Sequence, residues 1–195
     1  SGGLRLPELE LRAGEAVALI GPSGAGKTTA LQVIVGLMPL AEGRLEVCGV
    51  PLDAGNADAW RARLSVLPQR PHFPDRRLAE WLDPRGTGAD PWPALQLAGA
   101  AHVVGALPEG LETRLGETGS GVSGGEARRL MIARAVMAGG DLLLADEPTA
   151  DLDADTAGAV IEALARLRAE GRTLLVATHD PALIAAMDRA VEVGA

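Results

Sequence analysis

The sequence is short of several residue types, and each shortage narrows what the protein can be. It contains no tyrosine, one phenylalanine and one cysteine, Cys48. A single cysteine cannot form a disulfide within the chain, and we expect Cys48 to be a small apolar residue in a strand. The net charge is −8, with 26 acidic residues against 18 basic ones. This balance argues against a nucleic-acid-binding surface.

Long apolar stretches are also missing. The longest uncharged run, 91–108, contains three prolines, a glutamine and a histidine, so it indicates loops and short helices rather than a membrane span. No segment is typical of a signal peptide. The 195 residues are enough for one domain, or for one core with an inserted subdomain. The chain does not begin with methionine, and we expect it to be a piece of a longer protein.

Lys27 is the only lysine among the 18 basic residues; the other 17 are arginine. It lies within Gly21-Pro-Ser-Gly-Ala-Gly-Lys-Thr28, which matches the phosphate-binding loop pattern G-x-x-x-x-G-K-[ST]. Such a loop needs a compact ammonium on a flexible stem, which arginine cannot supply. Its backbone N–H groups and the helix that follows would surround phosphate, and the Thr28 hydroxyl would hold Mg²⁺.

The alternative is a glycine-rich turn before a buried helix. The flanks favour the phosphate loop, because the apolar run Ala16–Ile20 predicts a buried strand and Thr29–Leu37 predicts a helix. Strand, loop and helix are the context that the motif requires.

The rest of the chain predicts an α/β fold. Strands are expected at Leu4–Leu11, 43–50 and 64–67, of which the first two form an N-terminal antiparallel β element. Apolar strands at 141–145, 173–177 and 191–193 alternate with helices at 124–138, 154–169 and 181–187, which indicates a parallel sheet covered on both faces. Residues 71–121 are rich in proline and predict an inserted helical subdomain, so that 1–70 and 122–195 form the nucleotide-binding core.

Two carboxylates follow one apolar strand. Asp146 ends the run Leu142–Ala145, and Glu147 comes next. Adjacent carboxylates at the end of a buried strand are costly unless a cation or a proton relay uses them. We therefore expect Asp146 to bind a water of the Mg²⁺ shell and Glu147 to face the attacking water. The alternative is an acidic turn.

Ser123-Gly-Gly-Glu126 has two interpretations. Ser123 and Glu126 form a capping box that opens a helix. A cap does not require two glycines, however, and Gly124 and Gly125 would let the backbone approach a ligand. This makes a second phosphate-binding surface, which two chains packed head to tail could present to one nucleotide. Arg128 and Arg129 are expected on a solvated or ion-paired face, His72 and His102 at the surface or in packing, and the three tryptophans in packing.

With these motifs in order, the chain resembles the nucleotide-binding domain of an ATP-binding cassette (ABC) transporter over essentially its whole length. The resemblance implies a RecA-like P-loop NTPase core. It identifies 21–28 as Walker A, Gln69 as the Q-loop glutamine, 122–126 as the signature, 142–146 as Walker B, 150–153 as the D-loop and His179 as the switch histidine. The expected catalytic residues are Glu147, His179 and Lys27. The expected nucleotide-binding residues are Gly21, Pro22, Ser23, Gly24, Ala25, Gly26, Lys27, Thr28, Thr29, Gln69, Ser123, Gly124, Gly125 and Glu126, and the expected Mg²⁺ ligands are Thr28, Gln69 and Asp146.

The resemblance also implies partners: ATP and Mg²⁺ as cofactors, a second ATPase domain, identical or different, and a transmembrane domain on the N-terminal side. The domain would then lie at the cytoplasmic face of a bacterial inner membrane. The segment 107–119 resembles exporters, and among those the thiol (cysteine/glutathione) exporters linked to cytochrome bd assembly. Two departures stand out. No aromatic residue precedes Gly21 to stack on adenine, and Glu126 replaces the usual glutamine, which would weaken the composite site or mark one half of an unequal pair.

Two other functions compete with this interpretation. A non-transport ABC ATPase of DNA repair or chromosome maintenance would need a coiled coil or a basic face, and the sequence has neither. A P-loop kinase would not explain the motifs at 123–126 and 150–153.

Overall fold

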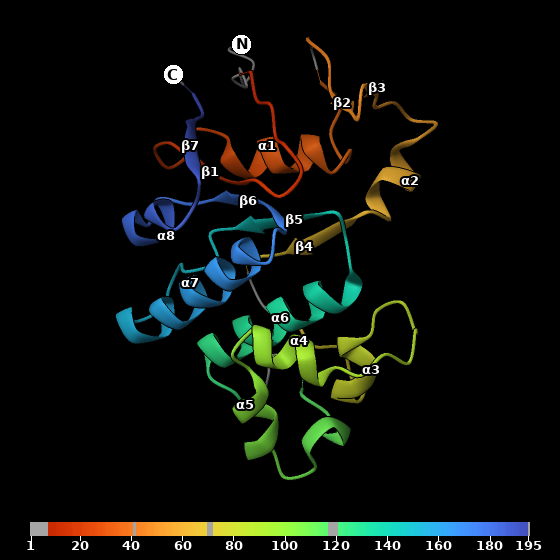
Figure 1. Cartoon of the computed structure of the whole chain (residues 1–195), viewed down its shortest axis with the longest axis vertical. Helices are drawn as coiled ribbons and strands as arrows, with labels where there is room; N and C mark the ends of the chain where they lie inside the picture. Colours follow the sequence, from red (N-terminus) through yellow and green to blue (C-terminus); the bar gives the residue numbers. More distant parts are fainter. Residues whose placement is uncertain (1–7, 41, 70–71, 117–120, 195) are drawn as a thin grey trace.

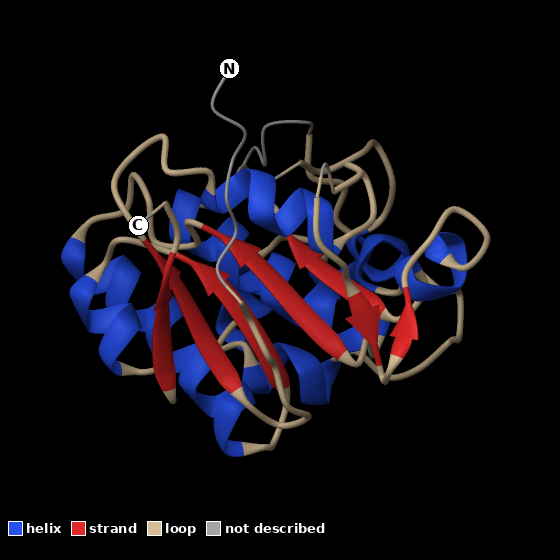
Figure 2. Cartoon of the chain, turned by 90° about the horizontal axis from the view of Figure 1, so that it is seen from above, coloured by secondary structure: helices blue, strands red, loops and turns tan. Residues whose placement is uncertain are grey.

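The computed structural model describes residues 8–40, 42–69, 72–116 and 121–194. At its centre is a sheet of five strands that all run parallel, in the order β4-β5-β6-β1-β7 (Figures 1 and 2). The strands are β1 (Ala16–Ile20), β4 (Leu64–Leu67), β5 (Leu142–Asp146), β6 (Thr173–Ala177) and β7 (Arg189–Glu192). The predicted α/β fold with a parallel sheet is therefore confirmed.

In the three central strands of the sheet, β5, β6 and β1, alternate side chains enter two separate cores, as the period of two in a strand dictates. Ala16 and Ala18 of β1 belong to a core shared with helices α6 (Gly124–Ala138) and α7 (Ala154–Ala169). Val17 and Leu19 belong to the opposite core, which includes residues of helix α1 (Lys27–Ile34). Both faces of these central strands are thus buried, which explains why they are mostly apolar, whereas the edge strand β7 is largely exposed.

Parallel strands bring all their carboxyl ends to one edge of the sheet. The loop after β1 carries Lys27, the turn after β5 carries Glu147, and the segment after β6 carries His179. Because β6 pairs with both β1 and β5, these three segments are neighbours in space although they are far apart in sequence.

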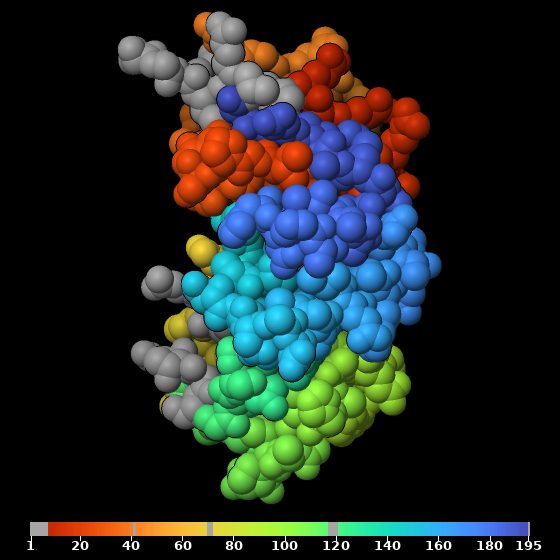
Figure 3. Space-filling model, turned by 90° about the vertical axis from the view of Figure 1, so that its left-hand side faces the viewer, coloured from red at the N-terminus to blue at the C-terminus, as the bar shows by residue number. Residues whose placement is uncertain are grey.

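The segment between β4 and α6 forms short helices at one end of the molecule, opposite α1 and β7 (Figures 1 and 3). They are α3 (Leu78–Leu82), α4 (Trp92–Leu97), α5 (Ala101–Ala106) and the 3₁₀ turn η1 (Gly110–Glu112). α3 and α4 pack on α6, where Trp81 is 4% exposed and its ring lies 4.6 Å from that of Phe73. The boundaries of a separate subdomain at 71 and 121 stay a prediction.

The N-terminal part differs in detail from the expectation. β2 (Glu46–Val47) and β3 (Val50–Pro51) form a short antiparallel hairpin, followed by helix α2 (Ala57–Arg61). Cys48 was expected inside a strand, but it lies exposed in the hairpin turn with φ 53°. Of the expected strand 4–11, residues 4–7 lie outside the described part, and 8–11 form no strand because they pair with no neighbouring strand there.

Two of the expected helices have different ends. Helix α1 begins at Lys27 rather than Thr29, and it ends at Ile34 because Gly36, with φ 76°, turns the chain. Helix α8 (Pro181–Ala185) is shorter than expected at its carboxyl end. Within the described ranges, no helix is both long enough and apolar enough to cross a bilayer.

Candidate nucleotide-binding site

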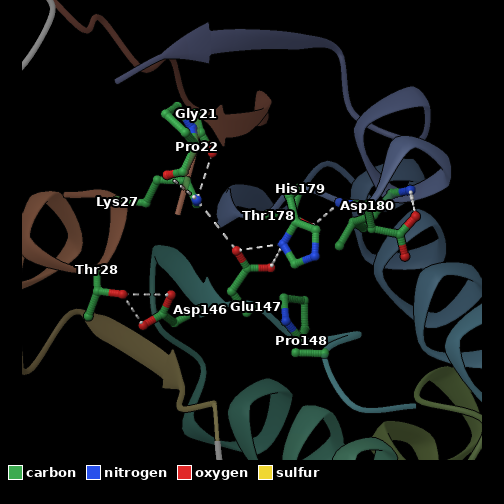
Figure 4. A network of polar contacts seen from close by, with 12 residues as sticks. Gly21, Pro22, Lys27, Thr28, Asp146, Glu147, Pro148, Thr178, His179 and Asp180 are labelled. Atoms are coloured by element: carbon green, nitrogen blue, oxygen red, sulfur yellow. Dashed lines mark hydrogen bonds and ion pairs between the residues drawn. The ribbon is translucent and has the colours of Figure 1, made fainter. Parts of the chain in front are cut away.

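The loop after β1 surrounds the ammonium group of Lys27. Gly26 precedes helix α1 with φ 95°, a left-handed conformation that favours glycine. Gly21 needs glycine for another reason, because a Cβ there would lie 2.7 Å from the carbonyl oxygen of Val193. Lys27 is 8% exposed, and its Nζ donates to the carbonyl oxygens of Gly21 at 2.9 Å and Pro22 at 3.4 Å (Figure 4). The only lysine of the chain is therefore buried at the mouth of this loop.

Thr28 and Asp146 place three oxygen atoms together. The Thr28 Oγ1 lies 2.9 Å from Oδ2 and 3.2 Å from Oδ1 of Asp146 (Figure 4). Burial raises the pKa of Asp146; the hydrogen bond from Thr28 opposes this rise, and the charge of Glu147 adds to it. A partly desolvated carboxylate beside a hydroxyl suits a hard cation such as Mg²⁺, which prefers oxygen ligands.

Glu147 is held in a strained backbone conformation. Its φ is 45°, in the left-handed region, which costs a non-glycine residue about 1–3 kcal/mol. Its N–H donates to the carbonyl of Ala177 in β6 at 2.9 Å. Its carboxylate lies between two partners, with Oε1 3.6 Å from Lys27 Nζ and 3.1 Å from His179 Nδ1 (Figure 4).

The second oxygen of this carboxylate is incompletely satisfied. Oε2 of Glu147 lies 3.0 Å from His179 Nδ1, but only Oε1 has the geometry of a hydrogen bond, so Oε2 is a buried acceptor without a hydrogen-bond partner among the described residues. A carboxylate oxygen left in this way is available to a ligand such as water. His179 itself is open to solvent, with 73% of its side chain exposed.

The structure brings Lys27, Thr28, Asp146, Glu147 and His179 together, and their role as site residues stays a prediction. Gln69 is exposed two residues beyond the end of β4, the strand beside β5, and among the described residues it makes no hydrogen bond to this cluster. The loop residues from Pro22 to Gly24 are exposed, and Ala25 and Thr29 are half-buried.

The signature segment lies apart from this cluster at the start of α6. The capping box is confirmed: Ser123 Oγ accepts from the Glu126 N–H at 3.3 Å, and Glu126 Oε2 accepts from the Ser123 N–H at 2.7 Å. That second bond lowers the pKa of Glu126, so its charge is held at the helix start. No hydrogen bond joins Ser123–Glu126 to the phosphate loop within the described ranges.

Gly125 has a packing role that the sequence did not reveal. A Cβ at Gly125 would lie 1.8 Å from Cγ2 of Thr156, so α6 and α7 can approach this closely only if residue 125 is glycine. Gly124 has more space, because a Cβ there would lie 3.6 Å from Cδ2 of Leu152, an ordinary contact distance. The two glycines therefore differ: close helix packing requires Gly125, whereas Gly124 leaves exposed backbone at the surface.

Arg128 corrects an expectation. It was expected on a solvated or ion-paired face, but it is 5% exposed and donates to backbone carbonyls of the turn after β5. Its neighbour Arg129 is half-buried and lies 3.5 Å from His102. The signal that could have indicated Arg128 is its spacing of five residues from Ser123, but spacing alone does not say what packs over that face of the helix.

The chain is similar to a known protein family and to individual proteins of that family. A family model described as "ABC transporter" matches residues 4–150. The mycobactin import ATP-binding/permease protein IrtB of Mycolicibacterium thermoresistibile is 38% identical over 188 residues, which cover 95% of this chain and 32% of that protein. The glutathione/L-cysteine transport system protein CydC of Bacillus subtilis is 34% identical over 174 residues, 88% of this chain and 30% of that protein.

A solved structure agrees in fold. A bacterial Atm1-family ABC exporter with ATP bound superposes with a TM-score of 0.83 at 31% identity, covering 95% of this chain and 33% of the other. The chain thus spans about a third of the length of each of these three relatives.

Proposed function

Because this chain belongs to the ABC transporter family, as an ATPase domain with the fold its motifs predicted, we propose that its phosphate-loop cluster binds MgATP and hydrolyses it. The observation that carries the proposal is the convergence of Lys27, Asp146, Glu147 and His179 at one edge of the sheet. They come from the carboxyl ends of three different strands and the segments that follow them, and charged groups gathered in this way are costly unless a ligand uses them.

Each side chain has a distinct role in this proposal. Lys27 and the backbone N–H groups of 23–28 hold the β- and γ-phosphates, and the positive start of α1 adds to this attraction. Glu147 accepts a hydrogen bond from the attacking water and orients it. His179 keeps the Glu147 carboxylate in place and contacts the γ-phosphate. Gln69 is exposed near the end of the neighbouring strand β4, and in this proposal it would contact the nucleotide and Mg²⁺. The chemistry is then mainly positioning and charge stabilisation.

The residues present fit Mg²⁺. Thr28 and Asp146 would hold it, and when bound it would neutralise charge on the phosphate oxygens. Within the described ranges no three acidic, histidine or cysteine side chains gather to hold an ion. Mg²⁺ often keeps several waters and takes further ligands from substrate phosphates, so a site with few protein ligands suits it.

A second copy of the domain would complete the site. Ser123, Gly124 and Gly125, with Glu126 behind them, would meet the nucleotide held by the partner's phosphate loop. Among the described residues the side chains of Ser123 and Glu126 bond each other and not the phosphate loop, and Ser123 is exposed, which supports this arrangement. The charge of Glu126, held at the helix start by Ser123, would weaken the contact relative to a glutamine.

We further propose that the domain powers an exporter-type membrane transporter from the cytoplasmic face of a bacterial inner membrane. The solved relative is an exporter, and the curated relatives combine an ATP-binding part with a permease part. The relatives' names include both mycobactin import and glutathione/L-cysteine transport at similar identity, so a thiol substrate remains a prediction about the membrane-spanning part. These relatives favour a transport role over DNA repair or chromosome maintenance.

The test is Mg²⁺-dependent ATP hydrolysis by the complete natural protein in its assembled form. We expect Lys27→Ala to lose ATP binding, and Asp146→Asn to lose Mg²⁺-dependent turnover while it retains some binding of ATP alone. Arg85→Ala, on an exposed loop, is the control and should have normal turnover. ATP binding that is unaffected in Lys27→Ala would contradict the proposed site.

A further inference from the structure

Arg128 is a buried cation whose partners are all backbone atoms. Its guanidinium lies on α6, one turn after the capping box, and the residue is 5% exposed. Burial lowers the pKa of Arg128, and the charge of Asp151 opposes this. A guanidinium buried in this way is costly unless its N–H groups find acceptors. The identity of those acceptors therefore indicates what the residue is for.

The acceptors all lie on the turn that carries Glu147. Nη1 of Arg128 donates to the carbonyl oxygens of Glu147 at 3.1 Å and Pro148 at 2.9 Å, and Nη2 donates to that of Ala150 at 3.3 Å. The planar fork of a guanidinium can serve several acceptors at fixed angles, which a lysine ammonium cannot do. One side chain of α6 thus holds three carbonyls of a four-residue turn.

This turn needs such support because its backbone is strained. Glu147 at its start has φ 45°, and Asp151 just after it has φ 61°. Left-handed non-glycine residues persist only where the surroundings hold them. The N–H of Glu147 is held from one side by Ala177 of β6, and its carbonyl is held from the other side by Arg128. The direction of the Glu147 carboxylate depends on both.

We propose that Arg128 is a positioning residue for ATP hydrolysis: it fastens the Glu147–Ala150 turn, and through it the Glu147 carboxylate, to the first turns of helix α6. The inference rests on the proposed role of Glu147 in orienting water. Because α6 begins at Ser123, Arg128 also connects the surface proposed to meet the partner's nucleotide with the carboxylate that acts on the chain's own nucleotide. Contact of Ser123 with the partner would in this way align Glu147.

The test compares Arg128→Gln and Arg128→Lys with Arg134→Gln in the complete natural protein, assembled as it normally is. Arg134 is the matched control, since it lies on the same helix, is half-buried and donates to a backbone carbonyl, that of Trp81, away from the site. We expect Arg128→Gln to lower kcat about 10- to 100-fold with KM for ATP changed less than about 3-fold. Arg128→Lys should recover part of the loss, and Arg134→Gln should keep kcat within about 2-fold.

Combination with Glu147→Gln separates this inference from the proposed function. If Arg128 acts through Glu147, Arg128→Gln should lower turnover little further in the Glu147→Gln background. Normal turnover in the single variant Glu147→Gln would contradict the proposed role of Glu147 in orienting water. Loss in Glu147→Gln with normal turnover in both Arg128 variants would overturn only the role of Arg128.

A purely structural role of Arg128 predicts a different result. In that case kcat would fall in Arg134→Gln as much as in Arg128→Gln, or KM would rise in step with the loss of kcat, and either result overturns the inference. Thermal unfolding of each variant shows whether it is folded at the assay temperature. If Arg128→Gln does not fold, Arg128→Lys decides the question through the same split between kcat and KM.

Discussion

Nζ of Lys27 lies 3.6 Å from Oε1 of Glu147, although the two residues follow different strands of the sheet. Their side chains are only 9% and 16% exposed, so water screens this ion pair weakly. The cation proposed to hold phosphate and the carboxylate proposed to orient water therefore already face each other. A phosphate that binds Lys27 must compete with this carboxylate.

Glu147→Gln should retain ATP binding and lose most hydrolysis, on the order of 10²–10⁴-fold. The glutamine amide cannot act as a base. Because it is also uncharged, it no longer forms an ion pair with Lys27, which is then free to bind phosphate. ATP affinity should therefore equal or exceed that of the natural protein, and an ATP-bound dimer should accumulate. Measurement of kcat together with nucleotide binding and size-exclusion chromatography checks this. Near-normal turnover would contradict the assignment.

Asp146→Asn should stabilise the nucleotide-free protein while it removes Mg²⁺-dependent activity. Burial raises the pKa of Asp146, so the folded protein binds this proton more tightly than the unfolded chain does. The resulting stability is present below the ordinary pKa of aspartate and is lost as the pH rises through the raised pKa. At neutral pH the charged carboxylate thus lowers stability, and asparagine avoids that loss.

Thermal unfolding at neutral pH measures the stability, and turnover with Mg²⁺ should fall at least about 10²-fold. Asp141→Asn, on the exposed residue before the same strand, serves as the control. A lower unfolding temperature for Asp146→Asn would refute the stability argument.

Ser123→Arg should block closure over the partner's nucleotide without loss of ATP binding by its own chain. The side chain of Ser123 is exposed, and a large cation there would meet the partner instead of the phosphate loop beside Lys27. Mixed with Lys27→Ala, it should restore one working site per dimer, and turnover should exceed that of either variant alone.

Thr87→Arg places the same side chain on an exposed loop and should leave closure unchanged. If Ser123→Arg abolished ATP binding by a chain shown to be monomeric, Ser123 would act on its own nucleotide and the trans arrangement would be wrong.

Gly125→Ala should destabilise the fold by about 1–3 kcal/mol, because the new methyl would lie 1.8 Å from Cγ2 of Thr156. Addition of Thr156→Ser removes that methyl and should recover part of the loss. Gly158→Ala on α7, with nothing within 4 Å of the new Cβ, should be neutral or stabilising by up to about 1 kcal/mol. Chemical denaturation measures all three. Equal effects of the two glycine substitutions would show that helix packing does not explain Gly125.

Local patterns were enough for much of the fold and the site. The glycine-rich loop at Lys27, the apolar strand that ends at Asp146 and the helices 124–138 and 154–169 all follow from neighbouring residues and their periods. Parallel strands bring Lys27, Glu147 and His179 to one edge of the sheet, and their action on a nucleotide stays a prediction. The grouping of chemistry-bearing residues is thus a consequence of strand order and direction.

What only the tertiary structure decided is how each charged or small residue is used. From the sequence alone, Arg128 was one of three arginines on the helix 124–138, and Gly125 was a glycine near a ligand. The turn after β5 covers the first, and Thr156 of α7 packs on the second. Both partners lie far along the chain from the residues they contact. Periodicity determines which side of a helix a residue occupies, but the element that packs on that side depends on the whole fold.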